Sequence, residues 1–422
     1  MSAAQRANSR SSDAQMADQN AFTRGAEKAG RLSVIALGFS IPISVALDNT
    51  LLAVILLCYL AGGRYREKLA AIAANPVFMA ALALFGVLAL AVSYGPAPAK
   101  DAARYLLKYS DLFCIPAIAT FFVDSRTRML GLRAFGAAIA VTLVLSFALS
   151  IELLPQTALF AQDPPYAVVF KHSLTHAVLV VFGALLFFLL ARYSESRRAR
   201  ITWLVLAALA AANVMFLVPG RTAYVILMVL LLYAGFAWSR WKGLLSMIAV
   251  TLIATTITFS VSEWFQARVH LGVQEYSAAD TSVAAKITNS IGLRLEYYRN
   301  SLNILRDHPL SGVGTGGFPK AYADQVKGTD MLLTQNPHNE YLLIAVQTGL
   351  VGLALLLYLF ARQFTLAPRL ASPLETHLAC GLVITMAVGC LFNSFLLDHT
   401  EGLFYAWFTG LLYGGLRARP PV

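Results

Sequence analysis

The sequence predicts an all-α, polytopic integral membrane protein that crosses the bilayer about twelve times. The first reason is composition: the 422-residue chain is 58% hydrophobic and only 13% charged, whereas soluble domains are about 45–50% apolar and about 25% charged. The second reason is arrangement, because most apolar blocks are long enough to span a hydrocarbon core of about 30 Å. A single membrane domain over residues 31–422 accounts for this pattern.

The basic residues predict the topology, because most of them lie in short connectors between apolar blocks. This positive-inside pattern explains the net charge of +11 and argues against nucleic acid as a partner. Residues 1–30 are polar and lack an apolar signal-peptide core, so we expect a disordered or surface-lying cytoplasmic tail. Both termini are then cytoplasmic. The cytoplasmic connectors carry Arg24, Lys28 and Arg31; Arg64, Arg66 and Lys68; Arg126 and Arg128; Arg192, Arg197, Arg198 and Arg200; Arg240 and Lys242; Arg362 and Arg369; Arg417 and Arg419.

The apolar blocks between these connectors give the predicted membrane spans. They are 33–47, 50–63, 76–95, 109–123, 129–150, 172–192, 201–218, 222–239, 243–261, 339–361, 375–395 and 402–416. The first two are short, and one long helix over 33–63 is the alternative. That helix would place Asp48 in lipid at a high cost, so we favour a turn at Asp48–Asn49.

Three segments are expected on the side away from the cytoplasm: 96–110, 151–171 and 262–337. The last is much the largest, and its seven Lys/Arg and seven Asp/Glu do not prevent translocation of so long a loop. Apolar residues at helical spacing predict an amphipathic helix over Ile291–Arg306. The four cysteines lie inside apolar blocks without metal-ligand spacing, so we interpret them as buried hydrophobic residues.

The segment NPHNEYLLIAVQTGLVG, residues 336–352, carries the strongest local signal for chemistry. Asn336 suits a helix N-cap and Pro337 the first helical position, which places His338 in the first turn, at the outer membrane boundary. The positive helix end favours a neutral imidazole, which can accept a proton. Gly349 lies three turns further on the same face and permits close helix approach. The alternative is that His338 only anchors a helix end.

Two arginines are expected on the same outer face. Arg221 follows the break at Pro219–Gly220 and starts a span, whereas Arg294 lies on the predicted loop helix. A planar guanidinium suits phosphate or carboxylate, although Arg221 could also be an interfacial anchor. Arg299 is a further candidate, with a surface pair to Glu296 as the alternative.

Weaker candidates are also basic or lie in outer turns. They are Arg104 and Lys108, which share a helix face; Lys171 and His172 at the start of a span; and Asp398, His399 and Glu401 in an outer turn. Each is more often an interface or turn residue than a ligand. The convergence of Arg221, Arg294 and His338 on one face nevertheless indicates a site for an anionic, lipid-linked substrate.

These motifs resemble those of bacterial O-antigen ligases (the WaaL family), within the wider O-antigen ligase and polymerase superfamily. His338–Asn339, followed by Gly349 and Gly352, matches the signature H[NSQ]X9GXX[GTY]. Arg221 resembles the arginine of the R(X3)L motif, with Val225 in place of leucine. Arg294 and the stretch HPLSGVGTGGF resemble the family's large periplasmic loop. The resemblance covers nearly the whole membrane portion, although only the stretches around 221, 291–318 and 336–352 are specific.

The resemblance implies transfer of a preassembled O-antigen glycan from undecaprenyl diphosphate to the outer-core sugar of lipid A-core. The reaction would take place at the periplasmic face of a bacterial inner membrane. Arg221 and Arg294 would bind the diphosphate and His338 would accept or orient the acceptor proton. No carboxylate cluster suggests a metal, so we expect a metal-independent, inverting reaction without cofactor.

Two other functions remain open at this stage. A polymerase or a protein O-oligosaccharyltransferase would use the same chemistry on another acceptor. A secondary transporter of an anion belongs to a different class, but transporters place charged residues near mid-membrane.

Overall fold

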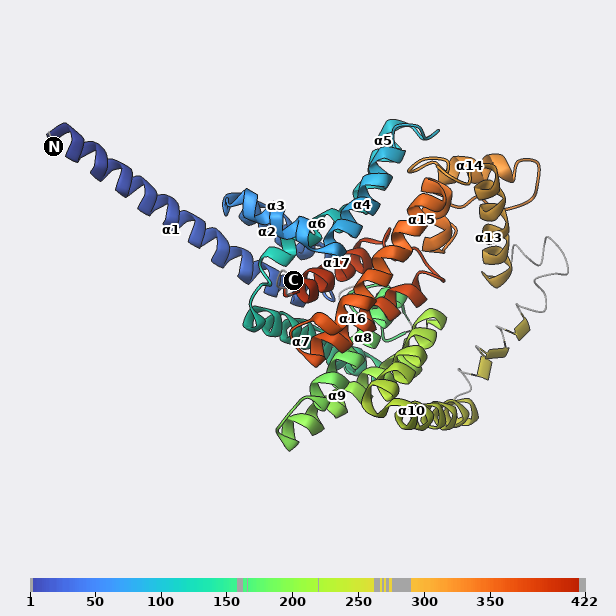
Figure 1. The fold of residues 1–422 in the computed structure, drawn as a ribbon. Coiled ribbons are helices and arrows are strands. Elements are labelled where there is room, and N and C mark those ends of the chain that lie inside the picture. Colours follow the sequence, from blue (N-terminus) through green and yellow to red (C-terminus); the bar gives the residue numbers. More distant parts are fainter. Residues whose placement is uncertain are drawn as a thin grey trace.

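The structure is a computed structural model that describes residues 3–157, 162–164, 166–218, 220–261, 266–267, 269–270, 273–274 and 290–416. Within these ranges the chain forms helices and turns and no strand, which confirms the all-α class (Figure 1). Outside the described residues lie Pro219, Arg417, Arg419 and most of 262–289, which is the first part of the predicted loop 262–337. The helices are α1 (Ala3–Ser40), α2 (Val45–Ala61), α3 (Tyr65–Ala74), α4 (Pro76–Ala91), α5 (Ala99–Lys108), α6 (Ser110–Thr120), α7 (Ser125–Ser150), α8 (Ser173–Arg192), α9 (Arg197–Phe216), α10 (Arg221–Val261), α13 (Ser290–Asp307), α14 (Phe318–Gln325), α15 (Glu340–Leu366), α16 (Pro373–Gly389) and α17 (His399–Tyr413).

Several helices are long and apolar enough to cross a membrane. Within the described ranges there are 5 such helices, or up to 6 if α2 and α3, which meet at 114°, are counted as one broken span. Helices α4 and α16 are apolar but shorter. These helices agree with the prediction of a polytopic membrane protein, whereas the number twelve and the orientation of the termini stay predictions.

Side-chain caps explain where many of these helices begin. Ser44, Asn75, Asp124, Ser196 and Ser372 each accept a hydrogen bond from a backbone amide in the first turn that follows. Four of these caps lie within a few residues of a predicted span boundary. Helix α10 joins the predicted spans 222–239 and 243–261, and its non-helical break at Ser239–Arg240 marks the predicted connector.

The first turn is not where the sequence prediction placed it. Helix α1 runs to Ser40 and α2 starts at Val45, so a turn at Asp48–Asn49 is wrong. Asp48 instead lies in the first turn of α2, fully buried, where it accepts a hydrogen bond from Ser40 (2.6 Å) and pairs with Lys171 (3.4 Å). The hydrogen bond from Ser40 and the positive charge of Lys171 offset the cost of burying the Asp48 carboxylate, which the prediction had placed in a turn.

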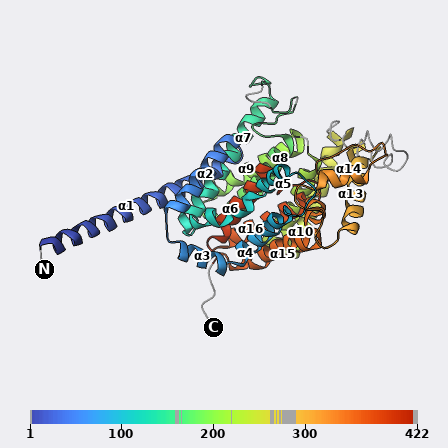
Figure 2. The ribbon, with the colours of Figure 1, turned by 90° about the horizontal axis from the view of Figure 1, so that it is seen from above.

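The N-terminal segment, which was predicted to be disordered or surface-lying, is helical over residues 3–30 and continuous with the rest of α1. In two views the start of α1 projects away from the other helices (Figures 1 and 2). Its cytoplasmic location stays a prediction.

The core is centred on α8 and α17, both of which are buried over most of their length. Aromatic rings of α7, α8 and α17 pack edge to face there, for example Phe182 with Phe408 at 4.6 Å between ring centroids. Helix α15 packs against α4, and α13 packs against α15. In both views α13 and α14 lie at the end of the protein opposite to the start of α1 (Figures 1 and 2).

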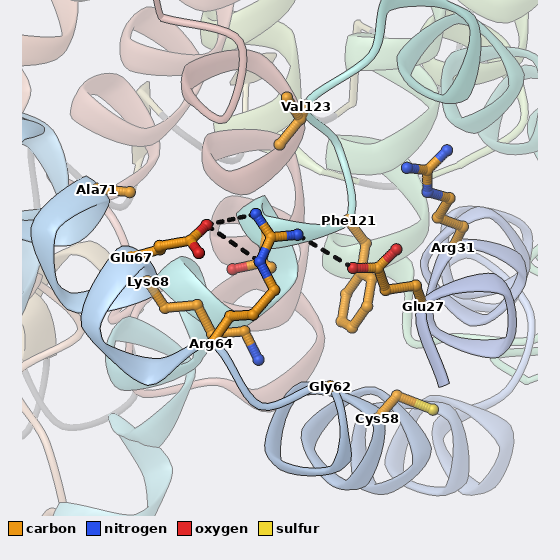
Figure 3. A pocket seen from close by; sticks show the side chains of 11 residues that line it. Glu27, Arg31, Cys58, Gly62, Arg64, Glu67, Lys68, Ala71, Phe121 and Val123 are labelled. Carbon is orange, nitrogen blue, oxygen red and sulfur yellow. Dashed lines mark hydrogen bonds and ion pairs between the residues drawn. The ribbon is translucent and has the colours of Figure 1, made fainter. Parts of the chain in front are cut away.

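At the other end, α1, α2 and α3 enclose a cavity of about 350 Å³ (Figure 3). Arg64, which has a positive φ of 54°, lies at the bend between α2 and α3 and pairs with Glu27 of α1 (3.5 Å) and with Glu67. Arg31 pairs with Asp124 (3.4 Å). The charged side chains that line this cavity largely neutralise one another, so the cavity is a weak candidate for an anion-binding site. Their ion pairs instead hold the bend between α2 and α3 against α1.

Candidate functional site

His338 lies immediately before a helix and not inside one. Helix α15 begins at Glu340, and Asn339 is its N-cap, with the side chain accepting from the Leu342 amide at 3.0 Å. The Asn336 side chain accepts instead from the His338 amide (2.8 Å), which closes a tight turn. The prediction that Asn336 caps the helix and that His338 occupies its first turn is therefore wrong.

The His338 backbone is held in the left-handed region, with φ at 53°. Two contacts fix it there: the turn with Asn336 and the hydroxyl of Tyr298, which lies 3.3 Å from the His338 carbonyl oxygen. The ring of Tyr297 stacks on the imidazole, with centroids 6.2 Å apart. A conformation that is rarely populated outside glycine persists only when its surroundings determine it, which is common at functional sites.

The imidazole is oriented by a short chain of polar side chains. Its Nδ1 lies 3.2 Å from Oδ1 of Asn393, and Nδ2 of Asn393 donates to Oδ2 of Asp398 at 3.2 Å. Because a carboxylate only accepts hydrogen bonds, Asp398 turns the amide oxygen of Asn393 towards His338. Nδ1 of His338 then carries the proton and donates it, which leaves the lone pair on Nε2.

The charge of Lys108 acts on Asp398. Burial raises the pKa of this carboxyl group, and the positive charge of Lys108 opposes that rise. Lys108 ends α5, so this helix also reaches the site.

Helix α13 brings Arg294 to the His338 turn, and the predicted helix over Ile291–Arg306 is confirmed by Ser290–Asp307. Tyr298, one turn after Arg294, donates to the Leu391 carbonyl (2.9 Å) and contacts that of His338. Burial raises the pKa of Tyr298, and the charge of Arg294, four residues earlier on the same face of α13, opposes that rise. A cation and an oriented imidazole thus meet on one side of the molecule.

Gly349 breaks α15 and does not share a helix face with His338 as predicted. Its φ of 68° and ψ of −167° are not helical. The loop after α13 fills the break: the Val313 amide donates to the Val346 carbonyl (2.8 Å), and the Leu350 amide donates to that of Pro309 (2.8 Å). Gly349 therefore seats this loop, which the sequence pattern alone could not indicate.

Substitution of Gly349 by alanine is expected to destabilise the protein strongly. This backbone conformation is essentially restricted to glycine and costs about 1–3 kcal/mol for another residue. An added methyl group would also overlap the Leu310 carbonyl and the Ser311 amide. The measurement is the thermal unfolding midpoint in detergent. Gly86→Ala is the matched control, because a methyl group there meets no atom within 4 Å; equal midpoints for the two variants would contradict the assignment.

The structure relates Arg221 to the His338 turn less directly than it relates Arg294. It is exposed as the first residue of α10, as the prediction expected. The contacts that hold the His338 turn come from α13 and from the 390–398 segment. Arg294 thus shares α13 with Tyr298, which contacts the His338 turn, and the roles of both arginines stay predictions.

The weaker candidates divide into buried and exposed groups. Lys171 is buried between Asp48 and Thr400, each at 3.4 Å, so its charge serves the packing of α2, α8 and α17. His172 is exposed at the start of α8. Arg299 pairs with Glu296 at 2.9 Å, as its alternative interpretation expected.

Asn393 is the site residue that sequence reasoning missed, and Asp398 was only a weak candidate. Both lie between α16 and α17, more than 50 residues after His338. The available signal was the group of polar residues Asn393, Ser394, Asp398 and His399, which interrupts an apolar stretch.

Fold and site together define a polytopic helical membrane protein with a histidine and an arginine gathered outside its long apolar helices. Residues 206–357 match the model of the O-antigen ligase family, and this span contains Arg221, Arg294, His338, Gly349 and Gly352. This match supports membership of the O-antigen ligase superfamily, whose members are membrane glycosyltransferase-like ligases and polymerases.

The chain is also similar to a curated protein over part of its length. An uncharacterized protein of Haemophilus influenzae is 28% identical over 193 residues, which cover 42% of this chain and 46% of the relative. The chain thus matches less than half of the length of this relative.

Proposed function

We propose that the protein is an O-antigen ligase, which transfers a preassembled glycan from undecaprenyl diphosphate to the outer-core sugar of lipid A-core. The observation that carries the proposal is the Asn393-oriented His338, whose turn is held by Tyr298 of α13, the helix that also carries Arg294. We place this site at the periplasmic face of the inner membrane, with both termini in the cytoplasm. Superfamily membership supports the lipid-linked glycan as substrate class.

The chemistry follows from the two side chains. Nε2 of His338 accepts the proton of the acceptor hydroxyl, whose oxygen attacks the anomeric carbon of the donor sugar. The bond from that carbon to the diphosphate oxygen breaks, and Arg294 and Arg221 stabilise the charge on undecaprenyl diphosphate. Attack opposite the leaving group inverts the anomeric centre. Cleavage of the diphosphate linkage drives transfer, so no nucleotide is needed.

The competing functions differ in acceptor or class. A polymerase would lengthen the lipid-linked glycan, and a protein O-oligosaccharyltransferase would need a protein acceptor. A secondary transporter is disfavoured because Arg294 and the His338 turn lie outside the long apolar part of the helices.

The decisive experiment mixes purified protein in detergent with undecaprenyl-diphosphate glycan and lipid A-core, in EDTA and without nucleotide. Wild type is expected to form a lipopolysaccharide ladder on a gel. Arg294→Ala and Arg221→Ala are expected to lower the rate about 10²–10³-fold, the usual loss for one preorganised donor to developing charge.

The control is Arg306→Ala, an exposed arginine on the same α13 that contacts Asn303. If Arg306→Ala loses as much activity as Arg294→Ala, the loss reflects damage to α13 and the diphosphate role fails. A longer lipid-linked glycan instead of a ladder identifies a polymerase, and folded wild type that transfers nothing while proteoliposomes accumulate solute identifies a transporter.

A further inference from the structure

A basic cavity of about 360 Å³ lies between α5 and α14, beside the His338 turn. Three cations line it, Arg104 and Lys108 from α5 and Lys320 from α14, against the single carboxylate of Asp101. Its volume is within the range of small-ligand sites, which is about 300–1,000 Å³. The cavity thus combines a half-open concave surface with an excess of positive charge.

The one ion pair in the cavity neutralises little of this charge. Arg104 and Asp101 lie 3.9 Å apart, with side chains 67% and 55% exposed. Such exposed pairs are weak and are readily exchanged for a better partner. Lysine and arginine side chains that converge in this way are suited to a phosphate group, which accepts several charge-assisted hydrogen bonds.

One hydrogen bond and one electrostatic interaction connect the cavity to the candidate site. Tyr105, which also lines the cavity, donates from its hydroxyl to the Gln335 carbonyl at 2.6 Å, three residues before His338. Lys108 acts on Asp398, the residue that orients Asn393. The cavity therefore meets the His338 turn on the side of Gln335 and Asp398, whereas Arg294 reaches this turn through Tyr298.

We propose that this cavity binds a phosphate group of the acceptor, so that Arg104, Lys108 and Lys320 hold a phosphorylated lipid A-core while its hydroxyl meets His338. This inference rests on the proposed function. It assigns the two substrates to different cations: the diphosphate of the donor to Arg294 and Arg221, and a phosphate of the acceptor to the α5–α14 cavity.

The test uses the full-length protein and two acceptors, native lipid A-core and the same lipid after phosphatase treatment. Kd is measured for each acceptor without donor, and KM for acceptor and donor is measured in the ligation assay. In wild type, phosphatase treatment is expected to raise the acceptor Kd and KM. Lys108→Ala and Lys320→Ala should each raise the acceptor KM about tenfold, the value of one charge-assisted hydrogen bond, and leave the donor KM unchanged.

Matched controls separate this site from general electrostatics. Lys100→Ala removes an exposed lysine from the same α5 that does not line the cavity, so it should change neither KM. With Lys108 and Lys320 both replaced, the native and the phosphatase-treated acceptor should bind equally. Both lysines are exposed, so the fold should tolerate their removal.

Each contrary outcome has one meaning. Equal binding of the two acceptors by wild type overturns the proposal, and so does a rise in donor KM alone, which would assign the cavity to the donor diphosphate. If wild type transfers nothing, the proposed function fails, but the Kd measurements still decide whether Lys108 and Lys320 bind phosphorylated lipid A-core.

Discussion

Replacement of His338 by alanine is expected to lower kcat about 10²–10⁴-fold, the usual contribution of a positioned general base. The imidazole is half-buried, and its Nδ1 faces Asn393, so Nε2 is the nitrogen that can accept a proton. The fold should be retained, because the Asn336 and Tyr298 contacts involve the His338 backbone, which alanine keeps. The measurement is the single-turnover rate of ligation with saturating acceptor.

Two variants make this prediction specific. His308→Ala removes an exposed imidazole from the loop after α13 and should leave the rate unchanged. Asn393→Ala keeps the imidazole but removes its hydrogen-bond partner, so it should reduce the rate less than His338→Ala does. A His338→Ala enzyme with more than a tenth of the wild-type rate would show that this residue is neither the base nor an essential positioning group.

The second large effect is expected at the opposite end of the protein, in a buried ion pair. Nε of Arg128 lies 2.9 Å from Oε1 of Glu375, with side chains only 4% and 8% exposed. Nη1 of Arg128 also donates to the carbonyls of Phe122 (3.1 Å) and Val123 (2.6 Å). Arg128→Ala should therefore reduce the free energy of unfolding by about 3–5 kcal/mol, because Glu375 would be left buried and unpaired.

Thermal unfolding in detergent, with Tm as readout, tests this pair. Arg133→Ala is the control, because this arginine is exposed on the same α7. The double variant Arg128→Met with Glu375→Leu should be more stable than Arg128→Ala, since no buried charge remains. A Tm for Arg128→Ala equal to that for Arg133→Ala would mean that the pair contributes nothing to stability.

Local patterns sufficed to predict the long apolar helices, but not the short helices α3, α5 and α14 or every turn. The apolar stretches of α7, α8 and α9 were predicted within a few residues, because their length and their flanking basic residues are local signals. The first turn was misplaced because the prediction treated Asp48 as an unpaired charge. Its partner Lys171 lies 123 residues away in the chain, and no local pattern reveals such a pair.

In the candidate site, too, local motifs were predictable from the sequence, whereas contacts between distant segments were not. His338 and the helix that carries Arg294 were identified from short motifs, and the contacts through Tyr298 bring them together. The path from His338 through Asn393 to Asp398 depends on how α16 and α17 meet, which the sequence does not specify. Gly349 was recognised as a motif residue but given the wrong role, because its partner Leu310 comes from another segment.

The left-handed backbone of His338 has a consequence for how this site can change. Among ordinary residues, glycine and, less readily, asparagine adopt a φ near 53° at little cost, so substitution by either should relax the chain. Substitutions that relax this backbone would thus remove the imidazole on which the proposed chemistry depends. If that chemistry is confirmed, stability and activity would place opposite demands on this one position.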